Sequence, residues 1–144
     1  MAPAGEKHDH AALMDSIYRG QKYIYDITRK YYLFGRDDLI RGLDCQPGDG
    51  VLEIACGTGR NLAKVQQAYP GTRLFGIDIS AEMLKSAQGK LGTKAILAPA
   101  DARQFDARAM LGRPTFERVI LSYSISMIPD WERAMRHAAT LVAP

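Results

Sequence analysis

Three acidic residues stand at or just after the ends of three short apolar segments of the sequence. Glu53 lies near the end of the first segment, before a small-residue turn that contains Gly57 and Gly59. Asp78 ends the second segment, and Asp101 follows the third. Repeats of strand, turn and helix predict a parallel α/β sheet, in which the carboxyl ends of the strands gather at one edge and bind ligands. The spacing therefore predicts a ligand site lined by three carboxylates.

The turn after the first segment limits the kind of ligand. Gly57 and Gly59 would let a ligand approach the backbone, and the N-terminus of the following helix would offer free N–H donors. A dinucleotide site needs a third glycine where this sequence has Leu62, and the carboxylate of Glu53 would repel a pyrophosphate. A cationic cofactor is therefore favoured over a nicotinamide dinucleotide, and a plain strand–helix turn remains the structural alternative.

The second and third acidic residues suit an adenosine. An acidic side chain at the position of Asp78 typically accepts hydrogen bonds from both ribose hydroxyls, and Ile79 and Met83 would form an apolar wall for the purine. Asp101 would accept a hydrogen bond from the adenine amino group, while Ala102 offers its backbone N–H. The alternatives are a helix cap for Asp78 and a solvated loop carboxylate for Asp101.

The elements that must position these residues are predicted by apolar periodicity. An amphipathic helix is expected at 10–34 and a short one at 39–43, and alternating strands and helices then predict a doubly wound parallel sheet. Ser80 and Asp130 are placed as helix N-caps. We expect strands buried on both faces at 51–55, 73–78, 95–98 and 118–122, helices at 61–68, 81–91 and 130–142, and a helical turn near 106–110. The sheet is expected to be truncated after its fourth strand and the following helix.

Size and charge exclude several classes of protein. A chain of 144 residues with 47% apolar and 24% charged residues suits one domain, and a net charge of +3 spread along the chain gives no nucleic-acid footprint. No apolar stretch approaches the roughly 20 residues of a membrane span. Cys45 and Cys56 predict neither a disulfide nor a metal site. A cytoplasmic protein is expected, with weak contact to an anionic membrane surface left open.

The acidic and glycine positions, together with Leu121-Ser122-Tyr123 after the fourth strand, resemble the class I S-adenosylmethionine-dependent methyltransferases over residues 48–142. This resemblance implies a Rossmann-like fold with S-adenosylmethionine as cofactor. Ala55 replaces the usual first glycine, a small-for-small change expected to be harmless. The resemblance divides the chain into a helical cap at 1–46 and a cofactor domain at 47–144, incomplete at its C-terminus.

The resemblance implies that Gly57 and Gly59 border the methionine part, Asp78 the ribose, and Asp101 with Ala102 the adenine. The residue pattern adds Arg36, which would pair with the carboxylate of the cofactor or of an acceptor, or be solvated. Together they give the expected cofactor-binding residues: Tyr18, Arg36, Glu53, Ala55, Gly57, Gly59, Asn61, Asp78, Ile79, Met83, Asp101, Ala102 and Ser122.

A finer resemblance concerns the acceptor. The strings at 25–29, 33–37 and 52–61 look like those of the diacylglycerylhomoserine N-methyltransferases of betaine-lipid synthesis, which methylate the homoserine amine of a lipid. Tyr18, Tyr25 and Tyr32 share one helical face and would either contact a cation, at about 0.5–2 kcal/mol each, or only pack the helix. Tyr25 and Tyr123 are the candidate catalytic residues. The alternatives are another small-molecule or lipid acceptor, or a cofactor-binding module without activity.

Overall fold

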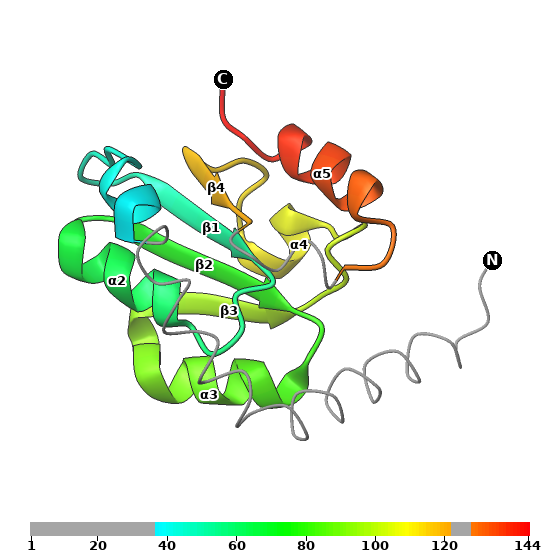
Figure 1. The fold of residues 1–144 in the computed structure, drawn as a ribbon, viewed down its shortest axis with the longest axis horizontal. Helices are drawn as coiled ribbons and strands as arrows, with labels where there is room; N and C mark the ends of the chain where they lie inside the picture. The colour runs from blue at the N-terminus through cyan, green and yellow to red at the C-terminus, as the bar shows by residue number, and fades with distance from the viewer. Residues whose placement is uncertain (1–36, 122–127) are drawn as a thin grey trace.

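The computed structural model describes residues 37–121 and 128–144, which form a four-stranded parallel sheet with helices on both faces (Figure 1). The strands lie in the order β3-β2-β1-β4. The chain moves outward from β1 to β2 and β3, then returns past β1 to β4, which confirms the doubly wound fold. The strands are β1 (Gly50–Ile54), β2 (Arg73–Asp78), β3 (Ala95–Pro99) and β4 (Arg118–Ile120).

Two cores lie on opposite faces of the sheet because successive strand side chains alternate in direction. Val51 of β1 packs in the core beneath α2 and α3, whereas Leu52 and Ile54 pack in the core beneath α4 and α5. A 3-10 turn, η1 (Gly92–Lys94), links α3 to β3, and residues 37–41 are also helical. The helices are α2 (Arg60–Ala68), α3 (Ala81–Leu91), α4 (Ala107–Leu111) and α5 (Trp131–Thr140).

Within the described residues the predicted strand and helix bounds agree with the structure to within two residues, but the predicted burial does not hold throughout. Every residue of β1 is buried, whereas Ile96 in β3 is 51% exposed. The prediction that all strands are buried on both faces is therefore wrong for β3, and also for β4, which is only half-buried at Arg118 and Val119. These two strands lie at the edges of the described sheet, whereas the fully buried β1 lies inside it.

The two predicted helix caps differ. Ser80 has an extended backbone and its side chain accepts a hydrogen bond from the N–H of Met83 at 3.2 Å, which confirms the cap of α3. Asp130 also precedes its helix, α5, but its backbone is left-handed (φ 53°) and its side chain forms no capping bond. Asp130 thus occupies the predicted N-cap position but does not cap α5 with its side chain, because a cap side chain reaches the first turn from an extended backbone.

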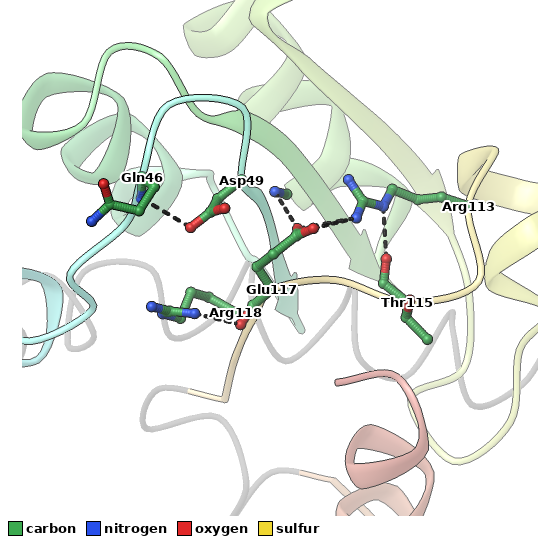
Figure 2. Close-up of polar contacts among 7 residues, drawn as sticks. Gln46, Asp49, Arg113, Thr115, Glu117 and Arg118 are labelled. Atoms are coloured by element: carbon green, nitrogen blue, oxygen red, sulfur yellow. Dashed lines mark hydrogen bonds and ion pairs between the residues drawn. The ribbon is translucent and has the colours of Figure 1, made fainter. Parts of the chain in front are cut away.

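A polar cluster closes the amino end of the sheet (Figure 2). The Glu117 carboxylate accepts a hydrogen bond from Gly50 N–H at 2.6 Å, and an Arg113 Nη atom lies 3.0 Å from both of its oxygens. The Arg113 guanidinium also bonds the Thr115 carbonyl and lies 5.3 Å from the Phe116 ring centroid. Burial opposes ionisation of Glu117, but the Gly50 N–H and Arg113 outweigh it and lower the pKa of the carboxyl group.

The segments before β1 and after α5 are hydrogen-bonded to the sheet. Arg118 donates hydrogen bonds to the carbonyls of Leu43 and Asp44, and Ile40 is buried in the core beneath α2. After α5, Phe116 exchanges backbone hydrogen bonds of 2.7 and 2.8 Å with the chain around Val142, so that this segment runs parallel to the start of β4. Among the described residues, no helix is long and apolar enough to span a membrane.

Candidate functional site

Glu53 and Asp78 lie on the same face of the sheet, at the carboxyl ends of its two central strands. Glu53 shares a face of β1 with Val51, and Asp78 shares a face of β2 with Leu74; Val51 and Leu74 belong to the core beneath α2 and α3. The two acidic residues are 2% and 3% exposed. Two carboxylates buried beside each other are costly unless their oxygens are hydrogen-bonded.

Backbone N–H groups supply those bonds to Asp78. Its Oδ2 atom accepts from Gly57 N–H at 2.9 Å and its Oδ1 atom accepts from Ser80 N–H at 2.8 Å. The Asp78 side chain thus ties the turn after β1 to the turn after β2. The sequence analysis considered Asp78 as a ribose acceptor or as a helix cap, and neither role includes this link between the two turns. Ser80 remains the residue that caps α3.

Asn61 holds the other buried carboxylate. It lies in the first turn of α2 and donates a hydrogen bond from Nδ2 to Glu53 Oε2 at 2.6 Å. The Cys56 thiol lies close by and is also buried. Burial first, and then the charges of Glu53 and Asp78, raise the pKa of Cys56, so the thiol stays neutral. The charges of both carboxylates therefore act on the Cys56 thiol, so both lie near the turn that contains it.

The backbone of this turn is left-handed at three positions: Ala55 (φ 58°), Gly57 (φ 57°) and Gly59 (φ 80°). A methyl group on Gly59 would lie 2.9 Å from Leu91 Cδ1 and 3.1 Å from Ala87 Cβ, so the close packing of α2 on α3 requires glycine there. At Gly57 a methyl group would meet no described atom within 4 Å. The turn is thus packed against α3 at Gly59, whereas at Gly57 the Cβ side is open, with no described atom close to it.

The structure adds a conformational feature at Ala55. Replacement of the usual glycine by alanine, a small-for-small change, was expected not to harm ligand binding. The left-handed backbone at Ala55 shows that conformation matters here as well as size, because a Cβ atom in that region costs roughly 1–2 kcal/mol. That Ala55 leaves ligand binding unharmed stays a prediction.

Two further positions in this region are explained by packing. Leu62, which stands where a dinucleotide-binding turn has its third glycine, is fully buried in the core beneath α2. Sequence reasoning missed Gly76 in β2: a methyl group there would lie 2.9 Å from Cys56 Sγ and 2.8 Å from Leu97 Cδ2. A glycine inside an apolar strand is the signal that could have revealed this close approach.

Asp101 lies in the loop after β3, next to the end of β2, and has a partner that the sequence analysis missed. Ala100 N–H bonds the Asp78 carbonyl at 3.1 Å, which joins the loop after β3 to the end of β2. One residue later, the Asp101 carboxylate forms an ion pair with Arg103, with 2.7 Å between Arg103 Nη2 and Asp101 Oδ2. An Asp-x-Arg sequence in a loop directly after a strand was the available signal.

The remaining predicted residues divide into two groups. Ile79, Met83 and Ala102 are half-buried on the segments that follow β2 and β3, as an apolar wall would require. The predicted N-terminal helix and five site residues lie outside the residues that the structure describes, so their roles stay predictions: Tyr18, Tyr25, Arg36, Ser122 and Tyr123. No cluster of three or more potential metal ligands occurs within 37–121 and 128–144.

The arrangement fits the adenosyl cofactor expected from the sequence. Among the described residues no atom occupies the Cβ side of Gly57, and Asn61 in the first turn of α2 bonds the Glu53 carboxylate. The N-terminus of α2 suits a negatively charged group, and the Glu53 carboxylate suits a positively charged one. Asp78 lies at the end of β2 and Asp101 just after the end of β3, where a ribose and then an adenine would lie. A doubly wound sheet with this turn and these acidic residues defines the class I S-adenosylmethionine-dependent methyltransferases, whose cofactor is S-adenosylmethionine.

Comparison with known families agrees with this class. The family described as a methyltransferase domain matches residues 51–144, and the chain belongs to that family. Its relatives include the demethylmenaquinone methyltransferase of Desulfitobacterium hafniense (strain Y51), which is 24% identical over 94% of this chain and 56% of its own length. The phosphatidylethanolamine N-methyltransferase of Cereibacter sphaeroides is 33% identical over 64% of this chain and 44% of its own length. The chain thus spans about half the length of these relatives.

Solved structures support the fold. The S-adenosylmethionine-bound structure of CalS10, an amino pentose methyltransferase from Micromonospora echinaspora, superposes with a TM-score of 0.60 over 92% of this chain and 52% of its own. The two sequences are 23% identical over that match. The Rossmann-like arrangement predicted from the sequence is therefore shared with a methyltransferase of known structure.

Proposed function

We propose that this chain binds S-adenosylmethionine and belongs to an enzyme that methylates the homoserine amine of diacylglycerylhomoserine. The observation that carries the cofactor part is the turn at 55–59, open at Gly57 and held by the buried Asp78 carboxylate. When bound, S-adenosylmethionine supplies a methyl group already activated by the positive charge on sulfur. The protein then needs mainly to bind the two reactants, orient them and exclude water.

Individual residues would divide this task. Glu53, held by Asn61, would face the positively charged methionine portion, and Asp78 would accept hydrogen bonds from the ribose. Asp101 and the backbone N–H of Ala102 would recognise the adenine edge. Tyr25 and Tyr123 are proposed to contact the acceptor amine, and Tyr18, Arg36 and Ser122 the cofactor.

The choice of an amine acceptor is supported by the sequence strings that resemble the diacylglycerylhomoserine N-methyltransferases. It is also supported by the relative from Cereibacter sphaeroides, whose name places its methyl transfer on the amine of a phospholipid. A methyl acceptor of quinone type is the second candidate. It is favoured by the matches to demethylmenaquinone methyltransferases, which cover nearly the whole of this chain.

Cofactor binding is tested by titrating the full 144-residue chain with S-adenosylhomocysteine in a calorimeter. We expect Asp78→Ala to weaken binding about 100-fold, since it removes charge-assisted hydrogen bonds to the ribose and releases the Gly57 turn. Asp49→Ala is the matched control. It also removes a carboxylate that accepts a backbone N–H, from Gln46 at 2.9 Å, but at the amino end of the sheet. Equal affinity of the wild-type chain and Asp78→Ala would reject the cofactor assignment.

The acceptor is tested separately with methyl-labelled S-adenosylmethionine and three acceptors: diacylglycerylhomoserine, phosphatidylethanolamine and a demethylmenaquinone. Label in the homoserine lipid is expected. Label only in the quinone would replace the proposal by the second candidate. Cofactor binding without transfer to any acceptor would identify the chain as a binding module without activity of its own.

A further inference from the structure

A tight turn after β3 brings Arg103 back onto Asp101. Gln104 N–H bonds the Asp101 carbonyl at 3.1 Å, and Arg103 N–H bonds Asp101 Oδ1 at 2.9 Å, so backbone contacts define the turn. The Arg103 guanidinium then completes a two-point contact, from Nε to Oδ1 at 3.0 Å and from Nη2 to Oδ2 at 2.7 Å. Both oxygens of the carboxylate are therefore bound by one residue.

This contact restricts how the carboxylate can turn. A planar guanidinium that bonds both oxygens aligns its plane with that of the carboxylate, which a point charge such as a lysine ammonium does not do. The Arg103 and Asp101 side chains are 30% and 20% exposed, so the pair is partly shielded from water. It is expected to be stronger than an ion pair on an open surface, which contributes little.

The turn also joins two groups that would recognise a base. Asp101 supplies a hydrogen-bond acceptor, and Ala102, enclosed between Asp101 and Arg103, supplies a backbone N–H donor. The edge of adenine presents the complementary pair, a donor on its exocyclic amine and an acceptor at the adjacent ring nitrogen. Hypoxanthine presents the reverse pair, a carbonyl oxygen and a ring N–H. An acceptor and a donor in fixed relative positions would therefore distinguish the two bases.

We infer that Arg103 is a positioning residue for adenine recognition: it holds the Asp101 carboxylate beside the Ala102 N–H in the orientation that matches the adenine edge. This inference rests on the proposed cofactor function. It adds Arg103 as a residue that acts through Asp101. It also makes Arg103 responsible for the preference for an exocyclic amine over a carbonyl group.

The test measures a ratio of affinities with the full chain. Calorimetry gives the dissociation constants of S-adenosylhomocysteine and of S-inosylhomocysteine, in which a carbonyl replaces the amine. We expect the wild-type chain to prefer the adenosyl ligand by at least tenfold. Arg103→Ala should weaken adenosyl binding about tenfold while leaving inosyl binding unchanged, because a mobile carboxylate loses a charge-assisted hydrogen bond that only the amine can donate.

Two further variants separate this role from simpler ones. Arg103→Lys keeps the charge without the planar fork and should restore less than half of the lost preference, in free-energy terms. Arg113→Ala breaks the other arginine–carboxylate pair, at the opposite end of the sheet, and should lower the thermal midpoint while leaving the affinity ratio at its wild-type value. Circular dichroism checks that each variant is folded.

The outcomes are distinct. If the wild-type chain binds neither ligand, the proposed function fails, and with it this inference. If the wild-type chain prefers the adenosyl ligand and Arg103→Ala keeps that preference or binds more tightly, only the role of Arg103 is overturned. Full restoration by Arg103→Lys would assign the effect to charge alone and overturn positioning. A changed ratio in Arg113→Ala would show a global effect, which also overturns it.

Discussion

The two ends of the sheet each contain an arginine bound to a carboxylate, but the two pairs are built differently. At the amino end, Glu117 accepts a hydrogen bond from Gly50, which lies 67 residues away in the sequence, and so joins the start of β4 to the start of β1 (Figure 2). In both pairs the arginine is local to its carboxylate: Arg113 and Glu117 are four residues apart, and Arg103 and Asp101 are two residues apart. The Glu117 carboxylate also links two strands, whereas the Arg103 contact shapes a single turn.

The backbone shows the same contrast. Gly112, at the amino end, is left-handed because it ends α4, which is an ordinary place for glycine. Ala55, at the carboxyl end, is left-handed without ending a helix and without the short polar side chain that makes this conformation easier. Strain that local structure does not require is found at functional sites more often than elsewhere. The comparison separates a cluster that stabilises the sheet from one that we propose binds the cofactor.

The largest effect is expected inside the carboxyl-end turn. Gly59→Ala should destabilise the protein by about 3 kcal/mol, since it adds a clash with Leu91 and Ala87 to an unfavourable φ. Gly57→Ala has only the unfavourable φ and should cost about 1–2 kcal/mol, but its methyl group would enter the open side of the turn and weaken S-adenosylhomocysteine binding. Urea unfolding and calorimetry measure both. Equal destabilisation, or unimpaired binding by Gly57→Ala, would contradict this division of the turn.

A smaller effect is expected at the amino end. Glu117→Gln should lower the free energy of unfolding by about 1 kcal/mol at neutral pH, since Glu117 is only partly buried. The pKa of Glu117 is lower in the folded protein than its ordinary value of 4.5. Its contribution is therefore fully present above that value and is lost as the pH falls through the lowered pKa.

The difference in stability between the wild-type chain and Glu117→Gln should shrink accordingly in acid, as measured by urea unfolding between pH 7 and pH 3. Affinity for S-adenosylhomocysteine should be unchanged at neutral pH. A loss of affinity would show that the two ends of the sheet are not independent.

The smallest effect has the opposite sign. Ala55→Gly should stabilise the protein by about 0.5–1 kcal/mol, because relief of the left-handed strain exceeds the added freedom of the unfolded chain. The control is Ala63→Gly in the interior of α2, where the same change should cost about 1 kcal/mol. Thermal unfolding should show a raised midpoint for Ala55→Gly and a lowered midpoint for Ala63→Gly. Destabilisation by Ala55→Gly would mean that the alanine methyl makes packing contacts that outweigh its strain.

Local patterns predicted the elements well. Apolar segments located the strands to within two residues, and Ser80 was identified as a cap because a cap depends on residues three positions apart. Asp130 occupies the same type of position but fails as a cap, since its backbone conformation is decided by the chain around it. The exposure of Ile96 likewise depends on strand order, which no short segment contains.

The sequence by itself determined that Glu53, Asp78 and Asp101 lie at or just after the carboxyl ends of successive strands, because period and spacing are local properties and parallel strands end at one edge. Only the tertiary structure decided how those carboxylates are held: Glu53 by Asn61, Asp78 by the Gly57 turn, and Asp101 by Arg103. Hydrogen-bond partners depend on which way a side chain turns after the backbone has folded. Neither that direction nor the φ of Ala55 can be read from the order of the residues.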